Sequence, residues 1–226
     1  MNEPTSPETV AAWIDTAQRQ RDPFERVRRA SHEHREKHGP GCSVYPTSSG
    51  PLLAVLAVAI RAEWVLEVGC GLGYSALCLT HGSGALVETI ERDAEHARLA
   101  ELEIARAGYG DRIRVVRGRA ADLLPGLDGP YDLIFSDADP EEMPIALDHF
   151  LRLLRPRGLL VSANLFLAQF VPDLPGIEQM AQYRQRIIDD ERLLTGIVPG
   201  GLTLSALRGI RRPSEPMRTR SSSLLS

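Results

Sequence analysis

The stretch VLEVGCGLGYS, residues 65–75, decides the fold, because an apolar segment runs directly into a glycine-rich turn and the start of a second apolar segment. Its first half, VLEV, is typical of a strand buried in a parallel sheet. Gly69, Gly71 and Gly73 follow, and glycine permits the positive φ angles of a tight turn and the close approach of a ligand. Ser75 opens an expected helix, whose N-terminus offers free N–H groups and partial positive charge.

A glycine-rich turn also occurs where nothing is bound, so two acidic residues near it matter. Glu91 ends the expected strand ALVETI, where a carboxylate can accept hydrogen bonds from both ribose hydroxyls of a nucleotide. Glu67 stands directly before the turn, where it would repel a pyrophosphate but can bind a cationic or hydroxylated group. The Gly-x-Gly-x-Gly spacing also differs from the Gly-x-Gly-x-x-Gly of the dinucleotide fingerprint. Both observations disfavour a dinucleotide.

Composition favours one soluble α/β domain. The chain has 226 residues, of which 43% are hydrophobic and 25% charged. A net charge of −4 and a pI of about 5.9 argue against a general nucleic-acid binder. There is no signal-peptide pattern and no apolar run long enough for a bilayer, so we expect a cytoplasmic protein with no membrane contact.

Metal-binding patterns are weak in the sequence. The three cysteines include no Cys-x-x-Cys pair and imply neither a disulfide framework nor a zinc site. His32, His34 and His38 lie in an expected basic helix, where residues two apart point to different faces. We therefore expect these histidines to be solvated surface.

Strands and helices alternate along the chain. Strands are expected at 64–68, 86–90, 113–117 and 131–139, with a fifth beginning at Gly158 and a C-terminal hairpin around Pro199-Gly200-Gly201. The alternation predicts an α/β fold: a Rossmann-like, doubly wound, mostly parallel seven-stranded sheet with a C-terminal antiparallel hairpin and extra N-terminal helices.

Two helix predictions accompany this fold. The segment PLLAVLAVAI, residues 51–60, is apolar nearly all round and is expected to be buried. Asp139 and Pro140 are interpreted as the N-cap and first residue of the helix after the fourth strand.

Several stretches carry a resemblance that covers roughly residues 40–208. LEVGCGLGYSAL and DLIFSDAD are specific, and SVYPTSSGPLL, TIERD, LRPRGLLVSAN and VPGGLTLSALR support them. The chain resembles the class I S-adenosylmethionine (SAM) methyltransferases, and among them family 3, the catechol/caffeoyl-CoA type of small-molecule O-methyltransferases. The resemblance implies SAM as cofactor, a small-molecule acceptor and a homodimer.

The domain organisation follows from this resemblance and from the composition of the two ends, which are polar with prolines at 1–7 and rich in Ser, Arg and Pro at 211–226. We expect a flexible N-terminus at 1–7, a single methyltransferase domain at 8–210 and a disordered tail at 211–226. Within the domain, residues 8–60 form the N-terminal helices and residues 64–210 the SAM-binding core.

The resemblance also implies the residues that contact the cofactor. They are Tyr45, Glu67, Gly69, Cys70, Gly71, Gly73, Ser75, Glu91, Arg92, Ala120, Asp137 and Asp139.

The expected metal site departs from the family pattern. The family has the sequence D-A-D-K after the fourth strand and D-N after the fifth. The carboxylate and asparagine oxygens of these motifs bind Mg²⁺. Here Pro140 replaces the lysine and Ala163 replaces a carboxylate, and Lys37 is the only lysine of the chain. Asp137 and Asn164 remain as weak metal candidates. We therefore predict no tightly bound metal.

Catalysis then needs a base from the chain itself. Alignment beside a reactive methyl donor can supply much of the acceleration. Asp137 is the favoured catalytic residue, because a carboxylate at the carboxyl end of a parallel strand faces the ligand crevice. Asp139 and His38 are further candidates.

The sequence favours a SAM-dependent O-methyltransferase that acts on a hydroxyl of a small, catechol-like molecule. One alternative is a catalytically impaired SAM-binding or S-adenosylhomocysteine (SAH)-binding homologue that serves as a partner or regulatory subunit. An NAD-type oxidoreductase and an RNA methyltransferase are further alternatives, disfavoured by the glycine spacing and by the acidic charge balance.

Overall fold

The computed structural model describes most of the chain, namely residues 6–39, 42–45, 47, 49–137, 139–166, 175–198 and 201–209. The predicted tail at 211–226, most of the predicted flexible N-terminus and the hairpin residues Pro199 and Gly200 lie outside these residues.

A mixed sheet forms the centre of the molecule. Its seven strands have the order β3-β2-β1-β4-β5-β7-β6. Strands β1 to β5 are parallel, whereas β7 runs antiparallel to β5 and β6 antiparallel to β7, which confirms the predicted fold class. The strand bounds are β1 Trp64–Val68, β2 Leu86–Glu91, β3 Ile113–Arg117, β4 Tyr131–Ser136, β5 Leu154–Ser162, β6 Leu193–Val198 and β7 Leu202–Leu207.

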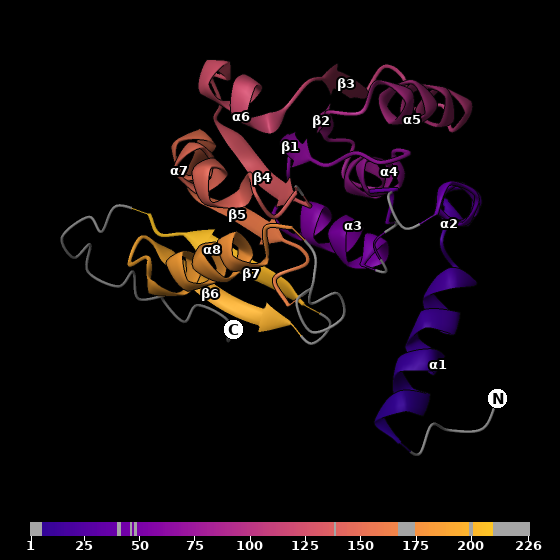
Figure 1. The fold of residues 1–226 in the computed structure, drawn as a ribbon, viewed down its shortest axis with the longest axis horizontal. Coiled ribbons are helices and arrows are strands. Elements are labelled where there is room, and N and C mark those ends of the chain that lie inside the picture. Colours follow the sequence, from indigo (N-terminus) through magenta and orange to yellow (C-terminus); the bar gives the residue numbers. More distant parts are fainter. Residues whose placement is uncertain are drawn as a thin grey trace, which may run out of the picture.

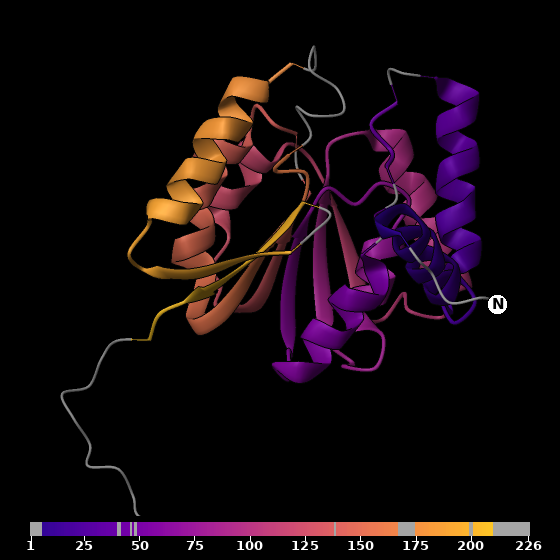
Figure 2. The ribbon, with the colours of Figure 1, turned by 90° about the horizontal axis from the view of Figure 1, so that it is seen from below.

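Helices cover both faces of the sheet (Figure 1 and Figure 2). Helices α2 to α5 contribute to one apolar core, and α6 to α8 to the other. No helix in the described part of the chain is long and apolar enough to cross a membrane. The helix bounds are α1 Pro7–Arg19, α2 Glu25–His38, α3 Gly50–Ala59, α4 Tyr74–Thr80, α5 Ala94–Arg106, α6 Ala120–Leu123, η1 Leu124–Gly126, α7 Met143–Leu153 and α8 Ile177–Asp189.

Strand β1 is buried on both faces, which explains why apolar residues in its sequence do not alternate with polar ones. Successive side chains of a strand point to opposite faces, and here Val65 joins one core while Leu66 joins the other. Val68 pairs with Ile90 of β2 and with Ser136 of β4. The residues that follow these three strands therefore meet at one edge of the sheet.

Strand β5 begins earlier than predicted. It starts at Leu154, directly after α7, and not at Gly158. Tyr131 already pairs with Leu154, and the register shifts between Tyr131 and Leu133. The shift accommodates Arg157, which has a φ of 67°. Pro156 and Gly158 therefore mark an irregularity inside β5 and not the start of the strand.

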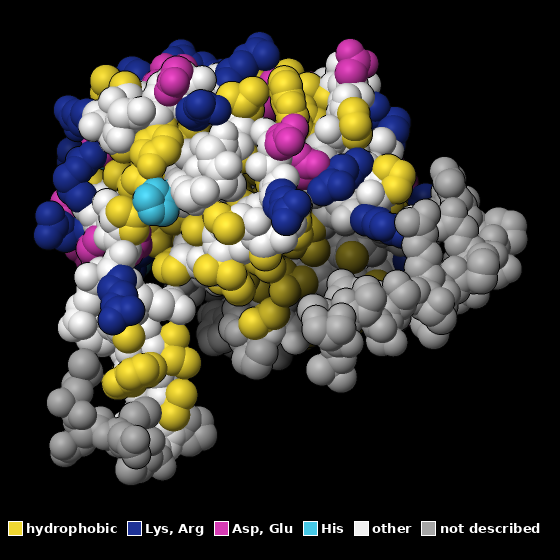
Figure 3. Space-filling model, turned by 180° about the vertical axis from the view of Figure 1, so that it is seen from behind, with side chains coloured by type: hydrophobic (Ala, Val, Ile, Leu, Met, Phe, Trp, Pro, Cys, Tyr) yellow, Lys and Arg dark blue, Asp and Glu magenta, His cyan; other side chains and the backbone are white. Residues whose placement is uncertain are grey.

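Helix α3 is not buried all round, contrary to the prediction. Leu53 and Ala57 are fully buried, whereas Val55 is 62% exposed and Val58 is 49% exposed. One face of α3 packs against α4, and the opposite face is open in the described structure. Hydrophobic side chains are also exposed along α1, which projects from the rest of the molecule (Figure 1 and Figure 3).

Candidate functional site

A cavity of about 610 Å³ opens where β1, β2 and β4 end. Its position matches the rule that ligands of open α/β sheets bind beyond the carboxyl ends of the strands, and its size suits a small-molecule site. Ten of the twelve residues predicted to contact the cofactor line it: Tyr45, Gly69, Cys70, Gly71, Ser75, Glu91, Arg92, Ala120, Asp137 and Asp139.

The glycine turn forms one wall of this cavity. Gly69 and Gly71 line it and have φ angles of 94° and 52°, which a side chain rarely adopts. Gly73 does not line the cavity. It is the left-handed N-cap of α4, and a Cβ atom there would lie 3.1 Å from Ile104 of α5. Gly73 thus permits close packing of two helices.

Glu67 belongs to β1, just before the glycine turn, and does not line the cavity. Its side chain is fully buried and accepts a hydrogen bond from the Thr89 hydroxyl. Burial raises the pKa of Glu67 to about 8. At neutral pH the carboxyl is therefore mainly protonated, and its Oε1 atom is buried without a hydrogen-bond partner among the described residues.

Glu91 links two loops at the end of β2. Its Oε2 atom accepts a hydrogen bond from the Gly71 N–H and its Oε1 atom from the Asp93 N–H, each at 2.9 Å. Each carboxylate oxygen can accept a second hydrogen bond. Glu91 is thus held in one orientation and keeps acceptor capacity for two ligand hydroxyls.

Asp139 is not the helix N-cap that the sequence suggested. Helix α7 begins at Met143 with Glu142 as its N-cap, and the proline of its first turn is Pro144. The Asp139 carbonyl accepts a hydrogen bond from the Glu142 N–H, which forms a turn before the helix. The Asp139 carboxylate instead forms an ion pair of 2.5 Å with Arg92. Both residues line the cavity, so two of the predicted cofactor contacts are paired with each other.

Asp137 follows β4 and lies at the floor of the cavity. Its N–H donates to the carbonyl of Val68 at 2.8 Å, and its carboxylate Oδ1 accepts a hydrogen bond from the side-chain amide of Asn164. Asn164 adopts a left-handed φ of 63°, a conformation that asparagine tolerates better than most residues. Burial, with a smaller effect of Asp139, raises the pKa of Asp137 to about 7.

These residues do not fit a magnesium site. Mg²⁺ requires several oxygen ligands in near-octahedral geometry. The Asn164 amide is turned to donate to Asp137, and Asp139 is paired with Arg92. Ala163 stands where the family pattern has a carboxylate, and its buried methyl side chain has no oxygen that could bind a metal.

Residues 42–45, which come after α2, also line the cavity. The guanidinium carbon of Arg35 lies 3.2 Å from the ring centroid of Tyr45, and its Nη1 atom donates to the Cys42 carbonyl at 2.9 Å. Arg35 and Cys42 were not among the predicted site residues. No sequence motif indicates either residue, because the contacts of Arg35 with Tyr45 and Cys42 form only when residues 42–45 pack against α2.

Comparison with known proteins identifies the family. A family model described as O-methyltransferase matches residues 19–207, most of the chain. The chain belongs to the O-methyltransferase family. A probable O-methyltransferase of Mycobacterium tuberculosis is 36% identical over 178 residues, which cover 74% of this chain and 79% of that protein.

Solved structures support the same assignment. The O-methyltransferase from Bacillus cereus, in complex with SAH, is 25% identical with a TM-score of 0.70, covering 86% of this chain and 97% of that one. The O-methyltransferase TomG from Streptomyces achromogenes, in complex with SAM, is 28% identical with a TM-score of 0.68, covering 81% and 89%. The predictions of a SAM-dependent O-methyltransferase and of its fold are confirmed.

Proposed function

We propose that this methyltransferase transfers the methyl group of SAM to a hydroxyl of a small, catechol-like molecule without a tightly bound metal, and that Asp137 is the general base. The observation that carries the proposal is a carboxylate with a pKa of about 7 in a cavity that offers Mg²⁺ no adequate ligand set.

The cavity walls give SAM a definite orientation in this proposal. The ribose hydroxyls donate to Glu91, whose two oxygens are already fixed by backbone N–H groups. The glycine turn lets the cofactor approach the backbone, Ala120 lies beside the adenine, and Arg92 contacts the cofactor through backbone or stacking. The related methyltransferases in complex with SAH and with SAM support the choice of cofactor.

Asp137 removes the proton that the acceptor hydroxyl must lose. A phenol with a pKa of about 10 transfers its proton more easily to a carboxylate of pKa about 7 than to an ordinary aspartate. The acceptor oxygen forms a bond to the methyl carbon, and the electrons of the breaking C–S bond stay on sulfur, which gives neutral SAH. The Asn164 amide holds the Asp137 carboxylate in place.

Methyl transfer to a panel of catechols and simple phenols tests the proposal, each run with Mg²⁺ and with EDTA. We expect turnover with EDTA within about two-fold of turnover with Mg²⁺. Activity that EDTA abolishes and added Mg²⁺ restores would contradict the proposal that methyl transfer needs no bound metal.

A second candidate is a catalytically impaired homologue that binds SAM or SAH and acts as a partner subunit. The replacements Pro140 and Ala163 favour it. SAH binding by calorimetry without turnover of any acceptor in the panel would support this candidate. The small-molecule acceptor, the homodimer and the cytoplasmic location stay predictions.

A further inference from the structure

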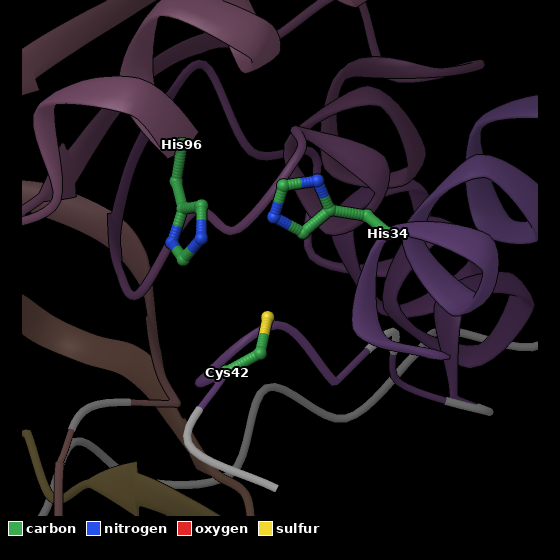
Figure 4. Close-up of side chains that lie close together, drawn as sticks. All are labelled: His34, Cys42 and His96. Atoms are coloured by element: carbon green, nitrogen blue, oxygen red, sulfur yellow. The ribbon is translucent and has the colours of Figure 1, made fainter. Parts of the chain in front are cut away.

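A second group of chemistry-bearing side chains lies beside the cofactor cavity. His34 comes from α2, His96 from the first turn of α5, and Cys42 from the segment between α2 and α3. One potential ligand atom of each residue lies within 4.8 Å of those of the other two, and the side chains point toward one another (Figure 4). The sequence analysis predicts His34 as solvated surface, because His32 and His34 point to different helix faces; Cys42 and His96, which the fold brings beside His34, belong to other elements.

The chemistry of this group suits a zinc ion. Two imidazole nitrogens and one thiolate are ligands that Zn²⁺ prefers, whereas Mg²⁺ and Ca²⁺ take oxygen ligands. In a tetrahedral zinc site these atoms lie about 3.5 Å apart, so a shift of about 1 Å would complete the geometry. Three protein ligands leave a fourth position for water.

The burial of these side chains supports a bound ion. Cys42 is 8% exposed and His96 is 9% exposed. The His96 Nδ1 atom is buried and makes no hydrogen bond within the described residues, and the nearest carboxylate oxygen, of Asp93, is 3.9 Å away. A buried polar atom without a partner is costly unless something unrecorded satisfies it. A metal ion would satisfy it.

The state of His34 is compatible with ligation. Its ring lies edge-on to His96 with a centroid separation of 5.2 Å, and it stacks on His38 at 4.3 Å. A ring nitrogen of His34 lies within 4.8 Å of a ligand atom of both Cys42 and His96, and a neutral imidazole has the free lone pair that a metal requires.

We propose that His34, Cys42 and His96 bind one Zn²⁺ ion, which fastens the segment over the cofactor cavity to α2 and α5. Cys42 also lines that cavity, and the following residues through Tyr45 do as well. The ion lies outside the reacting groups, so its role is to fix this wall of the cavity and not to activate the acceptor.

Metal content of the tag-free, full-length protein tests the proposal. The protein is dialysed against a chelator, reloaded with zinc, passed through gel filtration and analysed by mass spectrometry for metals. We expect about one zinc per chain in the wild type and in the control His32→Asn, which alters an exposed histidine of the same helix. Cys42→Ser and His96→Asn should each retain less than a tenth of that amount.

Cobalt gives an independent signature. Co²⁺ bound to the wild type and to the control Cys78→Ser should show thiolate-to-cobalt charge-transfer absorption, and Cys42→Ser should not. Zinc at less than a tenth per chain in the wild type, or full zinc in a folded Cys42→Ser, would overturn the proposal. If Cys42→Ser does not fold by circular dichroism, His96→Asn decides. These readouts do not depend on turnover, so they stand apart from the methyl-transfer assay.

Discussion

Glu91 connects the predicted ribose contact with the backbone that holds it. Because its two oxygens accept from Gly71 and Asp93, an amide at this position would face one of those N–H groups with its own NH₂ group. We expect Glu91→Gln to raise the Kd for SAH at least ten-fold, about 1.4 kcal/mol, by isothermal calorimetry.

Glu95→Gln is the matched control for this prediction. Glu95 is an exposed residue of α5 that pairs with Arg98 of the same helix, and its substitution should leave the affinity for SAH unchanged. Equal affinities for wild type and Glu91→Gln would remove Glu91 from the ribose site.

The residues that the sequence located well are those whose role follows from local spacing. Gly69 directly follows β1, Gly71 lies two residues further on and Glu91 is the last residue of β2, so their place at the sheet edge needs only the strand prediction. The Arg92–Asp139 ion pair and the contact of Arg35 with Tyr45 depend on tertiary packing, which spacing along the chain does not encode.

At the scale of elements, Gly73 sets how closely α4 and α5 pack. An alanine there would have a positive φ of 88° and a Cβ atom 3.1 Å from Ile104, whereas Gly84 has a φ of 71° and open space around it. We expect Gly84→Ala to lower the free energy of unfolding by about 1 kcal/mol, from backbone strain alone. We expect Gly73→Ala to lower it by about 2–4 kcal/mol, because overpacking against Ile104 adds to the strain.

Urea denaturation of the two glycine variants measures this difference. Equal losses for Gly73→Ala and Gly84→Ala would show that backbone strain, and not helix packing, explains the glycine at Gly73.

Element boundaries were predictable where one signal dominated. Aspartate is a preferred N-cap residue, and Asp93 caps α5 with its side chain, which accepts from the N–H groups of Glu95 and His96. Before α7, two prolines compete for the first turn, and the structure uses Pro144 and not Pro140. The start of β5 was mispredicted for a similar reason. Gly158 indicates a strand boundary, but it lies inside a strand that begins at Leu154 and continues through a register shift.

At the scale of the whole molecule, the buried carboxyl of Glu67 and the partly buried carboxyl of Asp137 make stability depend on pH. The pKa of Glu67 rises from 4.5 to about 8 on folding and that of Asp137 from 3.8 to about 7. The folded protein therefore keeps protons that the unfolded chain releases. This stabilisation is complete below the unfolded values and is lost as the pH rises through about 7 and about 8.

We therefore expect the free energy of unfolding of the cofactor-free protein to fall between about pH 5 and about pH 9, with each carboxyl contributing up to about 1.4 kcal/mol per pH unit. Glu67→Gln should make the decline shallower. Urea denaturation across this range measures it, and an unchanged slope in Glu67→Gln would show that Glu67 does not carry a proton in the folded protein.

The pH dependence of kcat/KM, measured in EDTA with saturating SAM, tests the central claim that Asp137 is the base of a metal-independent transfer. For wild type we expect activity to rise with pH to a plateau with a midpoint near 7, because only the ionised carboxylate accepts the proton. Asp137→Asn should bind SAH but lose at least about 100-fold in kcat/KM, together with this inflection. Wild-type turnover in Asp137→Asn, or a wild-type profile without an inflection near 7, would contradict the account.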